Sequence, residues 1–270
     1  MENANWSVEG KVILVTGGAA GIGAGLVRSL LYLNAWHVAF LDVLERKGGS
    51  LEGELLNKFG ALKAKFIKCD VSDEEQLSTA YKQVLDKYRR LDVVINNAGI
   101  IRDEEGFYKK TVDVNFTGTI TSTLRALDIM RTDKGGNGGV ILNVSSLLAL
   151  QQKPHSPVYA ATKTAVLQFS NYIATEELYA DTQVRIMTVC LGPTDTALLY
   201  RNNFGKELKS LTVQQSNKQR VTSAVDGIMG VISSGGNGST WIIAGDKPPV
   251  DVSTNVKEGF QIISMATNFV

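Results

Sequence analysis

A short apolar segment followed at once by clustered glycines constrains the fold of this chain more than any other feature. Residues 11–16 (Lys-Val-Ile-Leu-Val-Thr) are nearly all apolar, as in a strand buried within a parallel sheet. A glycine-rich turn and a helical pattern of leucines follow. Glycines at such a turn allow tight backbone geometry and close approach of a pyrophosphate to the helix N-terminus. The segment predicts a dinucleotide-binding turn that includes Gly17, Gly21, Ile22 and Gly23.

A second apolar strand over residues 37–41 ends at an acid, Asp42. An acid about 20 residues beyond a glycine turn is placed to accept hydrogen bonds from adenosine ribose hydroxyls. Its charge would also repel a 2′-phosphate, and no arginine follows it, since Val43 and Leu44 come next. The sequence therefore favours NAD over NADP, with Asp42 and Val43 at the ribose. A solvated turn aspartate is the alternative interpretation of Asp42.

Strand-like and helical segments alternate along the chain without a linker. This alternation predicts an α/β fold, a single-domain Rossmann-type doubly wound parallel sheet of about seven strands with helices on both faces. In such sheets ligands bind beyond the carboxyl ends of the strands. One helix is expected over Asp73–Tyr88, opened by a capping box of Ser72 and Glu75. The expected strands end near Thr16, Asp42, Lys68, Ile95, Val144, Cys190 and Ala244.

Length and composition set further limits. A chain of 270 residues fits one domain, with a cofactor half over about 8–145, a catalytic and substrate part over about 146–245, and a tail over 246–270. The formal charge of +1 gives no basic surplus for nucleic acid or an anionic membrane. Two cysteines make no disulfide framework, and neither a signal pattern nor a membrane-spanning apolar stretch is seen. We expect a cytoplasmic protein without a metal site.

Three side chains in the second half of the chain predict an acid–base centre. Tyr159 and Lys163 are four residues apart, so they share one face of a helix, and Ser146 lies 13 residues before Tyr159. A tyrosine titrates near pH about 10, and a neighbouring cation lowers that pKa by favouring the phenolate. General acid–base catalysis is strongest when the pKa lies near the working pH. The spacing alone is a weak signal, and the glycine turn upstream makes it meaningful.

In this order, the motifs resemble those of the short-chain dehydrogenase/reductase family over about residues 8–245. Two local features are similar to its 15-hydroxyprostaglandin dehydrogenase and insect alcohol dehydrogenase branch: the short gap between residues 96–99 and Asn115, and the glycine-rich run over residues 135–139. The motifs are specific for the family and only weakly specific for the substrate. They are Thr16–Gly23, Cys69-Asp70-Val71, Asn96-Asn97-Ala98-Gly99, Asn115, residues 143–146, Tyr159 with Lys163, and residues 192–196.

The resemblance implies a role for each remaining motif. It implies that Asn115 holds open a helix kink and a water that links Lys163 to solvent, although an exposed helical asparagine is the alternative. Asp70 would accept a hydrogen bond from the adenine amino group, or cap the helix that follows. The resemblance implies a catalytic set of Asn115, Ser146, Tyr159 and Lys163. It implies cofactor contacts from Cys69, Asp70, Val71, Asn97, Ala98, Gly99, Tyr159, Lys163, Pro193, Thr194 and Thr196.

The resemblance also implies an NAD-dependent oxidoreductase that acts on a hydrophobic secondary alcohol or ketone, such as a prostaglandin-, steroid- or terpenoid-like compound or a simple alcohol. The variable stretch over residues 197–220 carries Leu198, Leu199 and Phe204, which is typical of an apolar lid. Two alternatives remain, a catalytically idle cofactor-binding or storage protein and an NADP-dependent carbonyl reductase. Substrate contacts are expected from Ser146, Leu148, Ser156 and Tyr159.

Assembly is expected to be a homodimer or homotetramer. The helices expected around residues 107–131 and 158–178 carry apolar residues on more than one face, including Phe116, Leu167, Phe169 and Tyr172. A helix that is apolar beyond one stripe must bury the excess. In the family that the chain resembles, these helices pair between subunits.

Overall fold

A computed structural model of the chain describes residues 6–153, 156–200 and 218–269. One sheet of eight strands runs through it in the order β3-β2-β1-β4-β5-β6-β7-β8, and the pairings from β1 to β7 are all parallel. The predicted α/β class with a doubly wound parallel sheet is confirmed. The strands are β1 (Val12–Thr16), β2 (His37–Asp42), β3 (Ala64–Lys68), β4 (Val93–Asn96), β5 (Gly139–Ser146), β6 (Val184–Leu191), β7 (Thr240–Ile243) and β8 (Val250–Asp251).

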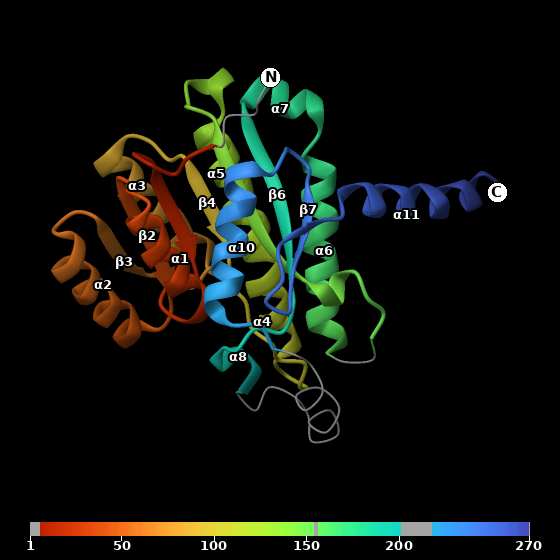
Figure 1. Cartoon of the computed structure of the whole chain (residues 1–270), viewed down its shortest axis with the longest axis horizontal. Helices are drawn as coiled ribbons and strands as arrows, with labels where there is room; N and C mark the ends of the chain where they lie inside the picture. Colours follow the sequence, from red (N-terminus) through yellow and green to blue (C-terminus); the bar gives the residue numbers. More distant parts are fainter. Residues whose placement is uncertain (1–5, 154–155, 201–217, 270) are drawn as a thin grey trace.

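Helices cover both faces of this sheet (Figure 1). They are α1 (Gly21–Tyr32), α2 (Glu45–Phe59), α3 (Glu74–Tyr88), α4 (Tyr108–Val112), α5 (Gly118–Met130), α6 (Pro157–Ile173), α7 (Glu176–Thr182), α8 (Ala197–Tyr200), α10 (Val221–Ser234) and α11 (Ser253–Met265). The shorter elements are the π-helical turn η1 (Asp113–Thr117) and the 3-10 turns η2 (Thr132–Lys134), η3 (Leu147–Ala149) and η4 (Ala266–Phe269).

Strand β1 supplies both hydrophobic cores, because successive side chains of a strand point to opposite faces. Ile13 and Val15 enter the core covered by α1, α2 and α10. Val12 and Leu14 enter the core covered by α3 and α5. All four side chains are fully buried. This two-sided burial explains why residues 11–16 read as a continuous apolar run.

The strand count corrects the expected number of about seven. The additional strand, β8, has two residues and pairs antiparallel with β7 through Trp241–Asp251 and Ile242–Val250. A two-residue edge strand contains no alternation or apolar run from which it could be recognised.

Three helix boundaries also differ from expectation. The N-cap of α3 is Asp73, whose carboxylate accepts from the amides of Glu75 and Gln76, while Ser72 donates to Asp70 instead. The helix expected over residues 107–131 is divided by the π-helical turn η1. The helix expected over 158–178 ends at Ile173, and Thr175 caps a separate helix, α7.

The tail carries the last long helix. Figure 1 shows α11 projecting from the edge of the sheet beside β7, and none of its residues is buried. Within the described part of the chain, no helix combines the length and the apolar character needed to cross a bilayer.

Asp92 connects the N-terminal ends of β1, β4 and β5. Its carboxylate accepts from the Val12 amide at 2.7 Å and from the guanidinium of Arg90, while its backbone carbonyl accepts from the amide of Val140. The Asp92 side chain is 2% exposed. Removing it would leave the buried Val12 amide without an acceptor and the Arg90 guanidinium without its ion-pair partner.

We therefore expect Asp92→Ala to lower the free energy of unfolding by about 2–3 kcal/mol. Urea denaturation followed by circular dichroism measures this loss, and Asp86→Ala on the exposed surface of α3 is the control. Equal stability of the two variants would contradict the role of Asp92.

Candidate active site

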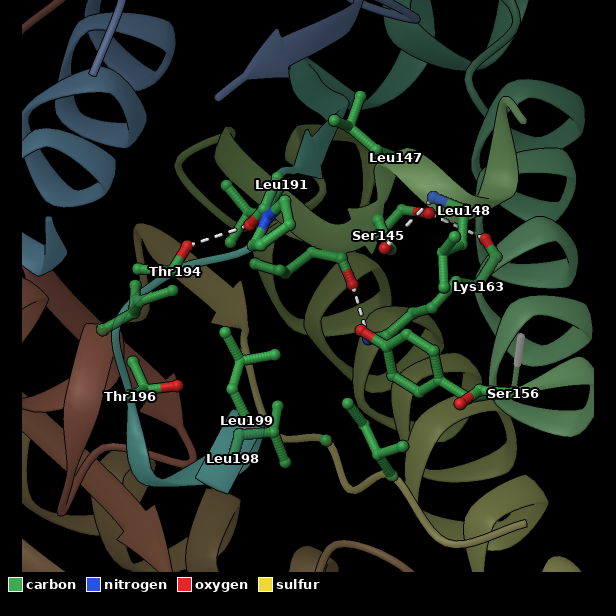
Figure 2. A pocket seen from close by; sticks show the side chains of 18 of the residues that line it. Ser145, Leu147, Leu148, Ser156, Lys163, Leu191, Thr194, Thr196, Leu198 and Leu199 are labelled. Atoms are coloured by element: carbon green, nitrogen blue, oxygen red, sulfur yellow. Dashed lines mark hydrogen bonds between the residues drawn. The ribbon is translucent and has the colours of Figure 1, made fainter. Parts of the chain in front are cut away.

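A cavity of about 510 Å³ lies beyond the carboxyl ends of β4, β5 and β6. Figure 2 shows Leu198 and Leu199 of α8 across this cavity from Lys163 and Ser156. Its walls are mainly apolar. The predicted site residues that line it are Ile22, Asn97, Gly99, Ser146, Leu148, Ser156, Tyr159, Lys163, Pro193, Thr194 and Thr196.

Ser146 and Tyr159 meet at this cavity from two different elements. Ser146 ends β5, and Tyr159 lies in the first turn of α6. Both side chains line the cavity, and the Ser146 hydroxyl oxygen accepts from the Leu148 amide at 3.2 Å. Desolvation raises the pKa of Tyr159 to about 12, and the neighbouring Ser146 hydroxyl opposes that rise. The phenol is therefore protonated at neutral pH.

Lys163 lies one turn further along α6, as the sequence spacing predicts. Its ammonium group donates to the Val144 carbonyl at 2.8 Å and lies 5.8 Å from the centre of the Tyr159 ring. Burial lowers the pKa of Lys163 to about 8.

This geometry corrects the expected direction of the Tyr159 pKa. We expected Lys163 to lower it, but the pKa is raised, because both groups are buried and the ammonium is directed at the Val144 carbonyl.

Asn115 is buried within the π-helical turn η1, so a local departure from α-helix occurs where a kink was expected. Its side-chain oxygen accepts from the Ile100 amide at 2.8 Å, and its amide nitrogen donates to the Ile100 carbonyl at 2.9 Å. The same nitrogen also donates to the hydroxyl of Thr162 on α6. Asn115 does not line the cavity. It joins the backbone after β4 to the helix that carries Tyr159 and Lys163.

The glycine turn packs against the end of β4. A Cβ atom on Gly17 would lie 2.8 Å from the Ala98 Cα, and Gly17 itself has a φ of 65°, which favours glycine. A Cβ atom on Gly23 would collide with the Gly17 carbonyl oxygen. The N-cap of α1, Ala20, has no side-chain hydrogen bond, and no acid occupies the first turn. The turn and this helix N-terminus therefore fit the pyrophosphate of a dinucleotide.

Asn97 and Ala98 hold the glycine turn from β4. The Asn97 side chain donates to the carbonyls of Thr16 and Gly17 at 3.0 and 3.1 Å, and the amides of Asn97 and Ala98 donate to the Thr16 hydroxyl. Gly99 lies beside Asn115 and Lys163.

Five of the residues expected at the adenosine end lie outside the cavity, namely Asp42, Val43, Cys69, Asp70 and Val71. The Asp42 carboxylate accepts from the amides of Ala19 and Leu44, both at 3.0 Å, which fixes it at the end of β2 beside the glycine turn. Val43 is exposed next to it, whereas Cys69 and Val71 are buried.

Among the described residues, Lys110 and Ser72 bind the carboxylate of Asp70. Its carboxylate accepts from Lys110 at 2.7 Å and from both the amide and the hydroxyl of Ser72. Burial acts to raise the pKa of Asp70, but these hydrogen bonds bring it below its ordinary value. The Asp70 carboxylate therefore binds Ser72 ahead of α3 and does not cap this helix, whose N-cap is Asp73, while its hydrogen bond to an adenine amino group stays a prediction.

The opposite wall comes from the loop after β6. The Thr194 hydroxyl donates to the Gly192 carbonyl at 3.0 Å and accepts from the side chain of Gln219 at 2.9 Å. Thr196 lies against Gly21, where an added Cβ would approach it to 3.2 Å. This loop and the glycine turn thus lie side by side at the mouth of the cavity.

Two expected substrate contacts, Leu148 and Ser156, line the cavity. Ser156 is buried with a φ of 48°, and its hydroxyl has no hydrogen-bond partner among the described residues. Leu198 and Leu199 are the part of the expected apolar lid that the structure describes. Phe204 lies outside the described residues.

Two residues of the site were missed from sequence. Gln219 is fully buried and supports Thr194 from 25 residues further along the chain. Asp103 accepts from the amides of Val158 and Tyr159. Neither belongs to a local pattern, because each acts on a segment that is distant in sequence.

Among residues 6–153, 156–200 and 218–269, no group of three or more histidine, cysteine or acidic side chains is arranged to hold a metal ion.

Known proteins are similar to this chain in sequence. The short chain dehydrogenase family profile matches residues 11–206. The 15-hydroxyprostaglandin dehydrogenase of Homo sapiens, whose name specifies NAD(+), is 38% identical over 192 residues, 71% of this chain and 71% of that protein. Alcohol dehydrogenase 2 of Ceratitis cosyra is 31% identical over 242 residues, 87% of this chain and 92% of that protein.

Solved structures show the same fold. Levodione reductase aligns with a TM-score of 0.75 and 21% identity over 88% of this chain and 97% of that one. The 3-ketoacyl-(acyl-carrier-protein) reductase from Brucella melitensis complexed with NADH aligns with a TM-score of 0.75 and 24% identity over 88% of this chain and 98% of that one.

The burial of Lys163 generates a pH-dependent prediction. Its folded pKa of about 8 lies below the ordinary value of 10.5, so the unfolded chain binds more protons between these values. The free energy of unfolding therefore rises with pH in this window. Relative to Lys163→Met, which cannot titrate there, wild type should gain up to about 3 kcal/mol across it.

Urea denaturation of both proteins at intervals across this pH window measures the gain. Both proteins contain Tyr159, so its own titration contributes to the stability of each. A difference that stays constant with pH, or that moves against wild type, would contradict the burial of an ionisable amine at this position.

Proposed function

The chain belongs to the short-chain dehydrogenase family, and from this premise we propose that it is an NAD-dependent oxidoreductase acting on a hydrophobic secondary alcohol or its ketone. The observation that carries the proposal is the placement of Ser146 and Tyr159 beside each other at the wall of a mainly apolar cavity. Two hydroxyl groups that meet at one point can both contact a single substrate oxygen.

Tyr159 is the proposed proton carrier. In ketone reduction its hydroxyl, protonated at neutral pH, donates its proton to the carbonyl oxygen, and in alcohol oxidation the phenolate takes the proton of the substrate hydroxyl. Ser146 donates a hydrogen bond to the same oxygen and stabilises the negative charge that develops there. NAD supplies the hydride acceptor, and NADH the donor, when bound.

Lys163 and Asn115 are proposed to support this proton transfer. The ammonium group of Lys163, which donates to the Val144 carbonyl, would bind the nicotinamide ribose. Asn115 would maintain the π-helical turn and the placement of α6 through its hydrogen bonds to Ile100 and Thr162.

The proposed cofactor contacts follow the geometry of the glycine turn. Gly17, Gly21, Ile22 and Gly23 would bind the pyrophosphate at the N-terminus of α1. The loop with Pro193, Thr194 and Thr196 would contact the nicotinamide side, and Asp42 with Val43 the adenosine ribose. Asp70, Val71, Cys69, Asn97, Ala98 and Gly99 would complete the adenosine side.

The nature of the cavity supports a hydrophobic substrate. Leu147, Leu148, Leu198 and Leu199 contribute apolar walls. Ser156, whose hydroxyl has no hydrogen-bond partner among the described residues, would offer a polar contact. The names of the two relatives, a hydroxyprostaglandin dehydrogenase and an alcohol dehydrogenase, favour a substrate that carries a hydroxyl group.

A cytoplasmic homodimer or homotetramer is part of the same proposal. Tyr172 on α6 is 81% exposed, and Leu124 on α5 is also exposed. These are the side chains that a second copy would cover if the helices pair between subunits.

We expect Tyr159→Phe to lower turnover by roughly 10²–10⁴-fold, because the variant lacks the proton-transferring hydroxyl. NADH absorbance during incubation with steroid, retinoid, terpenoid and short-chain alcohols measures turnover. The NADH dissociation constant should stay close to the wild-type value. Tyr172→Phe, on the exposed surface of the same helix, is the matched control.

Undiminished turnover by Tyr159→Phe would refute the assignment of the proton carrier. Tight NADH binding by wild type without turnover of any compound in the panel would favour the catalytically idle alternative.

We expect wild type to bind NADH more tightly than NADPH, and Asp42→Asn to narrow that preference by roughly tenfold or more. The substitution removes the charge that repels a 2′-phosphate but keeps an oxygen that can accept from Ala19 or Leu44. Fluorescence titration with both cofactors measures the ratio, with Asp226→Asn on α10 as control. Tighter binding of NADPH by wild type would establish the NADP-dependent alternative instead.

A further inference from the structure

The helix that carries Tyr159 has no cap from its own N-cap residue. Ser156 occupies this position with a φ of 48°, and its side chain makes no capping hydrogen bond. Pro157 follows at the first helical position and has no amide hydrogen to donate. The amides of Val158 and Tyr159 therefore need acceptors from elsewhere, because the first amides of a helix have no partner within it.

Asp103 supplies both acceptors. One carboxylate oxygen accepts from the Val158 amide at 3.1 Å and the other from the Tyr159 amide at 3.2 Å. The next amide, of Ala160, returns to the Ser156 carbonyl at 2.8 Å. Every amide of the first turn thus has a partner, and two of the partners come from a residue more than 50 positions earlier in the chain.

The segment that carries Asp103 is itself fixed. Its start is held by the paired hydrogen bonds between Ile100 and Asn115, and the Arg102 carbonyl accepts from the Thr111 hydroxyl at 2.6 Å. Ile101 between them is buried. The carboxylate of Asp103 is therefore presented to α6 by a backbone anchored on the helix that contains Asn115.

We propose that Asp103 is a positioning residue for Tyr159, acting as the N-cap of α6 from the loop after β4. Its bond to the Tyr159 amide sets the backbone from which the phenol reaches Ser146. A negative charge at a helix N-terminus also stabilises the first turn through the helix dipole. The inference rests on the proposed function only where it concerns turnover, since the capping role is independent of any substrate.

Asp103→Ala removes both acceptors, and Asp103→Asn keeps one acceptor oxygen of nearly equal capping strength. We expect kcat of Asp103→Ala to fall on the order of 10–100-fold, because small displacements of a reacting group reduce rates by such factors. The NAD dissociation constant should change by less than about twofold, since the glycine turn is untouched. Asp103→Asn should recover kcat to within about threefold of wild type. Glu105→Ala, an exposed acid on the same loop, is the matched control.

A second measurement needs no activity. Hydrogen exchange followed by mass spectrometry of a peptide over residues 157–163 should be faster in Asp103→Ala than in wild type, and unchanged in Glu105→Ala. Unaltered exchange in Asp103→Ala would overturn the capping role.

Faster exchange with unchanged kcat would overturn the positioning of Tyr159, as would an equal loss of kcat and NAD affinity. If wild type itself oxidises no alcohol, the proposed function fails separately, and the exchange rates still decide whether Asp103 holds the first turn.

Discussion

The site depends on the contact between the ends of β1 and β4, the two strands at which the order of the sheet reverses. A chain that returns past its first strand leaves a crevice at this point, where open parallel sheets bind their ligands. Four hydrogen bonds join the segment after β4 to the glycine turn. Asn97 and Ala98 donate them to Thr16 and Gly17. Because β1 is buried on both faces, the turn after it has little freedom to move.

Burial also determines the electrostatics of Tyr159 and Lys163. In the protein alone, desolvation raises the pKa of Tyr159 and lowers the pKa of Lys163, so the phenol is a weaker acid than an ordinary tyrosine. At neutral pH, Tyr159 is therefore a neutral phenol, and it lies beside the ammonium group of Lys163, whose pKa of about 8 makes it more acidic than an ordinary lysine. A proton donor suits carbonyl reduction directly, whereas alcohol oxidation first requires the phenol to ionise.

Much of the fold could be predicted from sequence because the decisive signals are local. The strand, glycine turn and helix at residues 11–33 follow from hydrophobic pattern and backbone geometry, and the four-residue spacing of Tyr159 and Lys163 places them on one face. The π-helical turn at Asn115 was anticipated only as a kink, since no residue pattern reports one extra residue in a turn. Gln219 and Asp103 could not be found, because each stabilises a segment remote in sequence. The pKa of Tyr159 was predicted in the wrong direction, because the degree of burial at a site is not visible in residue spacing.

The π-helical turn has a consequence for how this region tolerates changes in length. Each residue of an α-helix advances the chain by about 100° around the axis, so one residue removed from Asp113–Thr117 would rotate α4 relative to α5 by roughly that angle. Thr111, which binds the Arg102 carbonyl, and Ser122, which binds Asn96, lie on opposite sides of this turn. A regular helix could satisfy one of these attachments but not both. The extra residue in η1 thus sets the rotation of α4 relative to α5 that both attachments need. Deleting one residue here should destabilise the fold far more than deleting one in the loops at the opposite edge of the sheet.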